Sequence, residues 1–271
     1  MSGRGSQSLS GDSRVRAIMN DRFSLAGKHA LITGGTRGIG FAIVKGYLDA
    51  GAKVTFCGRK QAGVDEAMAQ LSSFPAQVQG LVAHVGKAAE IDRLLESCQA
   101  GWGGVDILVN NAGTNPYFGP IAESEDWAWE KTFDVNLTGP YRLSRALAAE
   151  MKKRGGGSIV NIASVAGLSA TPMQGIYSVT KAGLIMLTKV MARELGEAKI
   201  RVNCICPGVI KTQLSEALWK TPEAEREFSS LKALKRVGET DEIVGAAVYL
   251  ASDASSFTTG ATLQVDGGMI L

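Results

Sequence analysis

KHALIT (residues 28–33) runs directly into GGTRGIG (34–40), and the next stretch, FAIVKGYLDA (41–50), ends at Gly51. The first stretch is short and apolar, as in a buried strand, and the third has helical periodicity. The glycines between them permit positive φ angles and close approach to a pyrophosphate, and the helix start supplies unpaired N–H groups. An ordinary structural loop is the alternative. Strand, glycine turn and helix in this order favour a dinucleotide site with the spacing G-x-x-x-G-x-G.

The rest of the chain repeats this alternation. Strands are predicted at 52–58, 78–84, 105–110, 158–163, 200–206 and 262–265, and helices at 61–72, 88–100, 126–151, 175–197 and 241–251. The pattern predicts an α/β, doubly wound Rossmann fold: one domain with a mostly parallel sheet of about seven strands and helices on both faces. Residues 1–22 are expected to be a flexible extension before a domain over 23–271, and a charged stretch near 210–237 is expected to form a mobile substrate lid.

Composition excludes several function classes. The chain has 271 residues, 45% of them apolar, a net charge of +3 without basic blocks and only 6% aromatic residues, so we expect no nucleic-acid partner. No stretch is long and apolar enough to span a membrane, and we expect a cytoplasmic protein. Four cysteines suggest a reducing compartment, and Cys204-x-Cys206 lacks the companion Cys/His cluster that a metal site would need, so no metal is expected.

Tyr177 and Lys181 are the candidate reactive pair. Their i,i+4 spacing on a predicted helix places phenol and ammonium on one face, where the cation is expected to lower the pKa of the phenol from about 10 toward the working pH. Ser164 follows a buried strand, at the edge where α/β sheets bind ligands, and could hold a substrate oxygen. The pair alone is weak evidence, because an interfacial tyrosine and a solvated lysine often share this spacing.

The residues after the second strand indicate the cofactor. Arg59 and Lys60 stand where an NAD-selective Rossmann unit would place an acid, and Arg37 lies in the glycine turn. These cations would attract a 2′-phosphate, so NADP(H) is predicted. Both arginines could instead simply be solvated.

Three further stretches contribute. Asn111-Ala112-Gly113 ends a strand near the expected path of a ribose, and the turn from Pro207 to Thr212 could place backbone groups against a nicotinamide. Asn136 lies inside the helix predicted over 126–151, where it is expected to kink the helix around a water or to bond to solvent. That helix is too apolar for a solvated surface, so some of it is expected to meet another subunit.

The sequence resembles the short-chain dehydrogenase/reductase family from about Phe23 to Gly268. The matching motifs, in the family's order, are TGGTRGIG (33–40), NNAG (110–113), Asn136, Ser164, Tyr177-x-x-x-Lys181 and Pro207-Gly208. The resemblance implies that Tyr177 is the general acid/base, that Lys181 lowers its pKa and holds the nicotinamide ribose, that Ser164 orients the carbonyl and that Asn136 anchors a water. The expected cofactor-binding residues are Gly34, Thr36, Arg37, Gly38, Ile39, Gly40, Arg59, Lys60, His84, Val85, Asn111, Ala112, Gly113, Tyr177, Lys181, Pro207, Gly208, Val209, Ile210 and Thr212.

One departure concerns the adenine contact. Where the family commonly has Asp after the third strand, this chain has His84-Val85-Gly86-Lys87. That stretch is more similar to NADP-dependent carbonyl and retinal reductases of the dehydrogenase/reductase member 4 type. The resemblance implies hydride transfer between NADP(H) and a carbonyl or secondary alcohol. A homotetramer is predicted because the helices expected over 126–151 and 175–197 carry more apolar residues than one sheet face can cover. A 3-oxoacyl-thioester reductase, a sugar-alcohol dehydrogenase and a non-catalytic nucleotide-sensing relative remain open.

Overall fold

Seven strands form one parallel sheet in the computed structural model, which describes residues 22–270. The strands are β1 (His29–Thr33), β2 (Lys53–Gly58), β3 (Val78–Val82), β4 (Ile107–Asn110), β5 (Gly157–Ile162), β6 (Ile200–Pro207) and β7 (Thr262–Val265). Their order is β3-β2-β1-β4-β5-β6-β7, which confirms the doubly wound α/β fold. The extension expected over 1–22 lies outside the described residues, apart from Arg22.

The central strands are buried on both faces, which is why they read as continuous apolar runs in the sequence. Every residue of β1 is buried. In register, Leu31 pairs with Thr55 on one side and with Leu108 on the other. Alternate side chains of each strand point to opposite faces, so each strand contributes to two separate cores.

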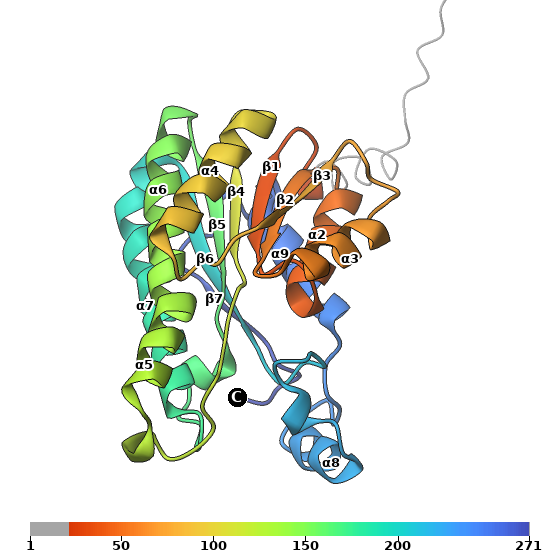
Figure 1. Cartoon of the computed structure of the whole chain (residues 1–271), viewed down its shortest axis with the longest axis vertical. Helices are drawn as coiled ribbons and strands as arrows, with labels where there is room; N and C mark the ends of the chain where they lie inside the picture. Colours follow the sequence, from red (N-terminus) through yellow and green to blue (C-terminus); the bar gives the residue numbers. More distant parts are fainter. Residues whose placement is uncertain (1–21, 271) are drawn as a thin grey trace, which may run out of the picture.

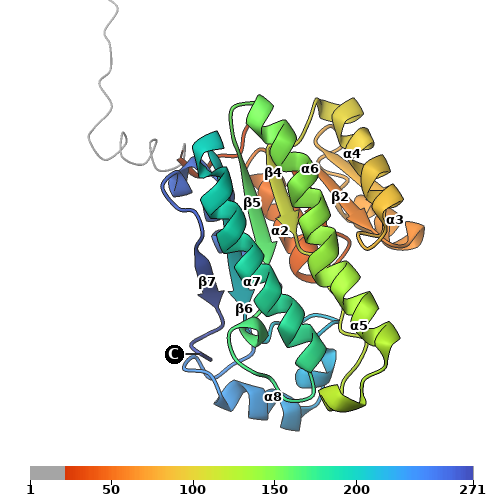
Figure 2. The ribbon, with the colours of Figure 1, turned by 90° about the vertical axis from the view of Figure 1, so that its left-hand side faces the viewer.

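Helices cover both faces of the sheet (Figures 1 and 2). They are α2 (Gly38–Asp49), α3 (Gln61–Gln70), α4 (Ala88–Trp102), α5 (Asp126–Phe133), α6 (Gly139–Lys153), α7 (Gly175–Leu195), α8 (Pro222–Ser230) and α9 (Val244–Ala251). One apolar core joins α2, α3 and α9 to the sheet, and a second joins α4, α6 and α7 to the other face. Helix α8 stands apart from both layers (Figure 1) and has no buried residue.

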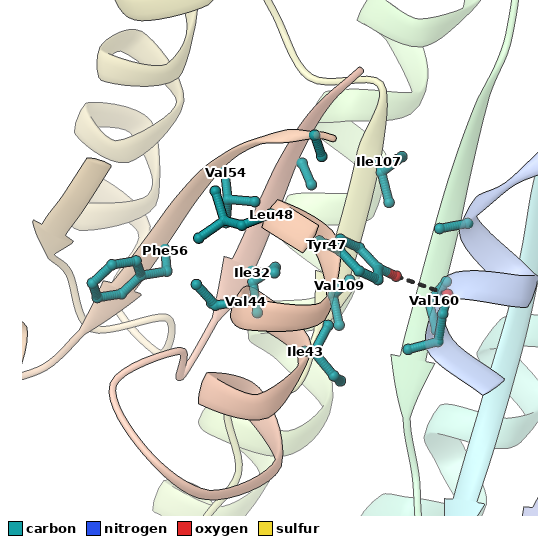
Figure 3. Packing of buried hydrophobic residues seen from close by; sticks show 14 of the residues in the cluster. Ile32, Ile43, Val44, Tyr47, Leu48, Val54, Phe56, Ile107, Val109 and Val160 are labelled. Atoms are coloured by element: carbon teal, nitrogen blue, oxygen red, sulfur yellow. Dashed lines mark hydrogen bonds between the residues drawn. The ribbon is translucent and has the colours of Figure 1, made fainter. Parts of the chain in front are cut away.

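The first core contains one buried phenol that links two helices. Tyr47 of α2 is fully buried among Ile32, Val109 and Val160, and its hydroxyl donates to the carbonyl of Ala247 in α9 at 2.9 Å (Figure 3). Burying a tyrosine is favourable only when its O–H finds a partner, and this bond supplies one. The bond therefore fixes α2, the helix that follows the glycine turn, against the C-terminal part of the chain.

The structure differs from the predicted elements at two helices. The helix predicted over 126–151 contains a π-helical turn at Asp134–Thr138 between α5 and α6, and the one predicted over 241–251 begins as a 3-10 turn, Thr240–Ile243, before α9. Asn136 lies in the π turn. It is fully buried rather than solvated, and its partners are protein groups.

Candidate active site

Ser164, Tyr177 and Lys181 come together at the carboxyl ends of β5 and β6. Ser164 follows β5 and caps a short 3-10 turn by accepting a bond from the Ala166 N–H at 3.1 Å. Tyr177 and Lys181 lie one turn apart near the start of α7, and the Lys181 Nζ is 5.5 Å from the centre of the Tyr177 ring. The i,i+4 spacing thus places both groups on the helix face that meets the sheet edge.

Burial dominates the electrostatics of this pair. The pKa of the Tyr177 phenol is raised to about 12 by burial, and the Ser164 hydroxyl opposes this only in part. The expectation that Lys181 brings the phenol pKa down toward the working pH is therefore wrong for the protein alone. The pKa of the phenol is raised because burial removes water from the site, and this desolvation penalises the charged phenolate. At neutral pH Tyr177 carries its proton and can donate it.

Lys181 is held as a buried cation. Its ammonium donates to the carbonyl oxygen of Ile162 at 2.8 Å, at the end of β5, and the residue is almost fully buried. Burial lowers the pKa of Lys181 to about 8, so most of this side chain is still charged at neutral pH. Such a group suits the binding of a polar, hydroxyl-bearing ligand portion next to Tyr177.

Asn136 joins the π turn to the strand-end loop after β4. Its Oδ1 accepts from the Thr114 N–H at 2.8 Å, and its Nδ2 donates to the Thr114 carbonyl at 2.9 Å and to the Thr180 hydroxyl at 3.1 Å. A Cβ on Gly113 would lie 3.7 Å from both Asn136 Oδ1 and Lys181 Nζ. Asn136 therefore connects the loop after β4 to α7 and does not itself line the cavity.

The glycine turn has the geometry that an anion site requires. Gly34 and Gly38 have φ angles of +66° and +57°, which favour glycine, and a Cβ at Gly34 would lie 2.9 Å from the Ala112 Cα. Helix α2 begins at Gly38, and its N-cap residue, Arg37, makes no side-chain capping bond. The first N–H groups of α2 are thus available to a phosphate.

Asn111 fastens this turn to the neighbouring strand. Its Nδ2 donates to the carbonyls of Thr33 and Gly34 at 2.9 and 3.1 Å, and its backbone N–H donates to the Thr33 hydroxyl. The Ala112 N–H bonds to the same hydroxyl. The stretch Asn111-Ala112-Gly113, which follows β4, is therefore bonded to the end of β1 and the start of the glycine turn.

A single cavity of about 800 Å³ is lined by both the glycine turn and the reactive trio. Of the residues expected to bind a cofactor or to react, all line it except Asn136, Lys60 and Val209. Lys60 is exposed at the N-cap of α3, and Val209 faces a second cavity of about 410 Å³. The lysine and arginine side chains in the lining are those of Arg37, Arg59, Lys181 and Lys211, and no acidic side chain from residues 22–270 lines the cavity.

Sequence reasoning missed several lining residues. Those at strand ends could have been found by extending the predicted strands. Those between Lys211 and Trp219 lie in the stretch expected to form a lid, but no pattern singled them out one by one. The lining residues that were not named are Cys57, Gly58, Ala83, Thr114, Val135, Ile162, Ala163, Lys211, Gln213, Leu214, Ser215, Trp219 and Thr240. Trp219 is fixed there because its indole N–H bonds to the Thr212 carbonyl and the Ser215 hydroxyl.

Cys204 and Cys206 lie in a small buried apolar cluster beside this site, with Ala163, Leu184 and Ile185. All four cysteines of the chain are free. Within residues 22–270, no three His, Cys, Asp or Glu side chains gather in a way that could hold a metal ion. In the same range, no helix has the length and apolar character needed to cross a bilayer.

Known proteins match nearly the whole chain. A family model described as enoyl-(acyl carrier protein) reductase matches residues 34–270. Dehydrogenase/reductase SDR family member 4 of Homo sapiens is 43% identical over 250 residues, which covers 92% of this chain and 90% of the relative. The Caenorhabditis elegans protein of that name is 39% identical over 247 residues, which covers 90% and 95%.

Solved structures agree with these sequence matches. A gluconate 5-dehydrogenase from Burkholderia cenocepacia J2315, in complex with NADP and tartrate, superposes with a TM-score of 0.87 at 36% identity and covers 93% of this chain and 98% of its own. A short-chain type dehydrogenase/reductase from Mycobacterium ulcerans has a TM-score of 0.87 at 33% identity and covers 91% and 90%.

Proposed function

Because this chain belongs to the short-chain dehydrogenase/reductase family of oxidoreductases, we propose that it passes hydride between NADP(H) and a carbonyl or secondary alcohol, with Tyr177 as the general acid/base. The observation that carries this proposal is the cavity of about 800 Å³, which has the glycine turn and the Ser164–Tyr177–Lys181 trio in one lining. Among the described residues, four lysine and arginine side chains and no acidic side chain line it. A ligand that is anionic along its length and reactive at one end fits such a cavity.

The residues present fit a phosphorylated dinucleotide. The glycine turn and the uncapped start of α2 would hold the pyrophosphate, and Arg37 and Arg59 would face the 2′-phosphate that distinguishes NADP from NAD. The gluconate 5-dehydrogenase with a similar fold binds NADP, which supports the same choice here. When bound, the nicotinamide would supply or accept the hydride.

The protein would supply orientation and the proton. Ser164 uses its oxygen to accept the Ala166 N–H, so its own O–H remains able to donate to a substrate carbonyl. Tyr177, a phenol whose pKa lies well above neutral pH, carries a proton that it would give to that oxygen during reduction. Lys181 would bind ribose hydroxyls and keep a positive charge beside the phenol.

We propose that residues 211–237 close over the substrate as a lid. Lys211, Gln213, Leu214, Ser215 and Trp219 of this segment line the cavity, while its helix α8 buries no residue in either core. A segment that reaches the site but adds little to the cores can move at small cost. We also propose a cytoplasmic location, which the four free, buried cysteines support.

A sugar-alcohol dehydrogenase is the second candidate, because one structural neighbour is named gluconate 5-dehydrogenase. A 3-oxoacyl-thioester reductase is an alternative substrate class within the same chemistry. The absorbance of NADPH can be followed with diketones, quinones, a 3-oxoacyl thioester and gluconate as substrates. The results distinguish a carbonyl reductase, a sugar-alcohol dehydrogenase, a 3-oxoacyl-thioester reductase and a non-catalytic protein.

The variant Tyr177→Phe tests the chemistry itself. It removes the proton donor but keeps the ring, so we expect kcat to fall by at least about 10² while the dissociation constant of NADPH changes little. Tyr141→Phe is the matched control, because Tyr141 is exposed on α6 and does not line the cavity. Near-full turnover in Tyr177→Phe would remove this residue from the mechanism.

A further inference from the structure

His84 lines the cavity from a turn that fixes the orientation of its ring. The residue follows β3 and is half-buried. Its carbonyl accepts from the Lys87 N–H at 2.9 Å, and its Nδ1 accepts from the Gly86 N–H at 3.1 Å. Its backbone N–H donates to Glu90 Oε2 at 2.7 Å. The imidazole is therefore part of the turn rather than a freely rotating side chain.

The bond at Nδ1 determines where the ring carries its proton. A nitrogen that accepts a hydrogen bond has no proton, so the proton is on Nε2. A Cβ on Gly86 would lie 3.0 Å from Cε1 and 3.1 Å from Nδ1, so this edge of the ring faces the turn. No hydrogen bond from any residue within 22–270 reaches Nε2. The ring thus offers one N–H donor away from the turn.

The sheet order places His84 at the end of the cavity opposite Tyr177. His84 follows β3, an edge strand, and Ser164 follows β5, with β2, β1 and β4 between them. The carboxyl ends of all these strands lie on one edge of the sheet. If the nicotinamide lies at Tyr177, as the proposed function requires, the other base of the dinucleotide lies beside His84.

We propose that His84 donates its Nε2–H to a ring nitrogen of the adenine and does not recognise the 6-amino group. Adenine ring nitrogens are acceptors, whereas the amino group offers donors. A donor can bond only to the former, so this side chain reads the base through its acceptor edge. An ionised aspartate at the same position could only accept a bond from the 6-amino group, because a carboxylate has acceptors and no donor.

Calorimetric binding of NADP⁺ analogues to the full chain tests this contact without any turnover. One analogue lacks the 6-amino group and keeps all ring nitrogens. Three others keep the amino group and replace N1, N3 or N7 by carbon. For the wild type we expect a loss of about threefold to tenfold in affinity for one of the ring analogues, the size of a single neutral hydrogen bond. The analogue without the amino group should change affinity by less than about twofold.

Two variants complete the test. His84→Asp should reverse the pattern, with the loss appearing only when the amino group is removed, and His84→Ala should discriminate against neither kind of analogue. A wild type that depends on the amino group would overturn the proposal. So would ring-nitrogen dependence that persists in His84→Ala, since it would assign the contact to the backbone. Absence of NADP⁺ binding to the wild type would refute the proposed function as well, whereas binding without this reversal refutes only the His84 contact.

Discussion

Single side chains set the charge preference of the cavity. Arg59 lines it directly after β2, while its neighbour Lys60 is exposed and outside the lining. A charge-assisted contact between Arg59 and a 2′-phosphate should contribute about 1.5 to 3 kcal/mol. We therefore expect Arg59→Ala to weaken NADPH binding by roughly tenfold to a hundredfold, as measured by fluorescence titration.

The same titration contains its own controls. NADH has no 2′-phosphate, so its affinity should barely change in Arg59→Ala. Lys60→Ala removes a neighbouring positive charge from the same loop and should leave NADPH binding within about twofold of the wild type. A wild type that binds NADH as tightly as NADPH would show that the arginines are merely solvated.

Another buried side chain makes stability depend on pH. His29 is buried at the amino end of β1, where its Nε2 bonds to the Thr55 hydroxyl at 2.9 Å and its Nδ1 to the Gly104 carbonyl. Asp106, Arg154 and Lys53 surround it, and burial, the largest effect, lowers the pKa of His29. As the pH falls below about 6.5, the unfolded chain binds the proton first, so the free energy of unfolding decreases.

The variant His29→Gln should remove this dependence. Urea unfolding at about pH 7.5 and about pH 5.5 measures this effect. Over the pH range in which His29 titrates, the free energy of unfolding of the wild type should fall by up to about 1.4 kcal/mol per pH unit more than that of the variant. A variant whose stability falls with pH as steeply as that of the wild type would assign the acid sensitivity to other groups.

The reactive pair shows how much of a site a sequence can predict. The i,i+4 spacing of Tyr177 and Lys181 was enough to place both on one helix face. The pKa of the phenol was not predictable, because it depends on burial by segments far apart in the chain. The same holds for the ammonium, whose partner is the Ile162 carbonyl, 19 residues away.

At the level of elements, helices α2 and α9 approach each other closely at Gly46 of α2. A Cβ on Gly46 of α2 would overlap Val244 Cγ1, a stiff branched side chain, whereas a Cβ on Gly245 would meet nothing. Gly46→Ala gains up to about 1 kcal/mol of helix propensity but overpacks the contact, which costs about 1 to 3 kcal/mol. We expect a net loss of stability in thermal unfolding.

Gly245→Ala is the matched variant, because it makes the same chemical change in a helix without the contact. It should gain up to about 1 kcal/mol. If both variants were equally stabilised, the close approach of α2 and α9 would not limit the side chain at position 46.

Most elements were predictable from strand and helix periodicity, but the π turn was not. Its five residues, Asp134–Thr138, keep the apolar pattern of the flanking helices, so the sequence pattern predicts one continuous helix across them. What marks the turn is the pairing of Asn136 with Thr114, 22 residues earlier. Such a contact exists only after β4 and the helix have come together.

At the scale of the whole molecule, we propose that apolar side chains on α5 to α7 form a subunit interface. Val179, Met186 and Val190 are exposed at spacings of seven and four on α7, and therefore on one helix face. Trp127 and Trp129 of α5 are also exposed, and the views show α5, α6 and α7 on the same side of the sheet (Figures 1 and 2). A face of this kind usually marks an interface.

We propose that this interface builds a homotetramer, and light scattering tests its mass. The wild type should have the mass of four chains at micromolar concentration, and Met186→Glu should shift it to smaller species because it buries a charge in the interface. Leu231→Glu, at an equally exposed leucine after α8, should leave the mass unchanged. A monomeric wild type would overturn the interface.

Residues 211–237 leave and rejoin the domain at neighbouring positions, and they make a second contact with it where the Ala233 and Leu234 N–H groups donate to the Gly268 and Gly267 carbonyls. Ile210 and Gly238 form an isolated parallel bridge, in which the Lys211 N–H bonds to the Gly238 carbonyl and the Gly238 N–H to the Val209 carbonyl. A segment closed at its base by backbone bonds can change in length and sequence without moving the strands on either side. We therefore expect residues 211–231 to be exchangeable: replacing them by the corresponding segment of a relative, with the bonds at Ile210–Gly238 and at Ala233–Leu234 kept, would change the cavity lining opposite the sheet edge while Tyr177 stays in place.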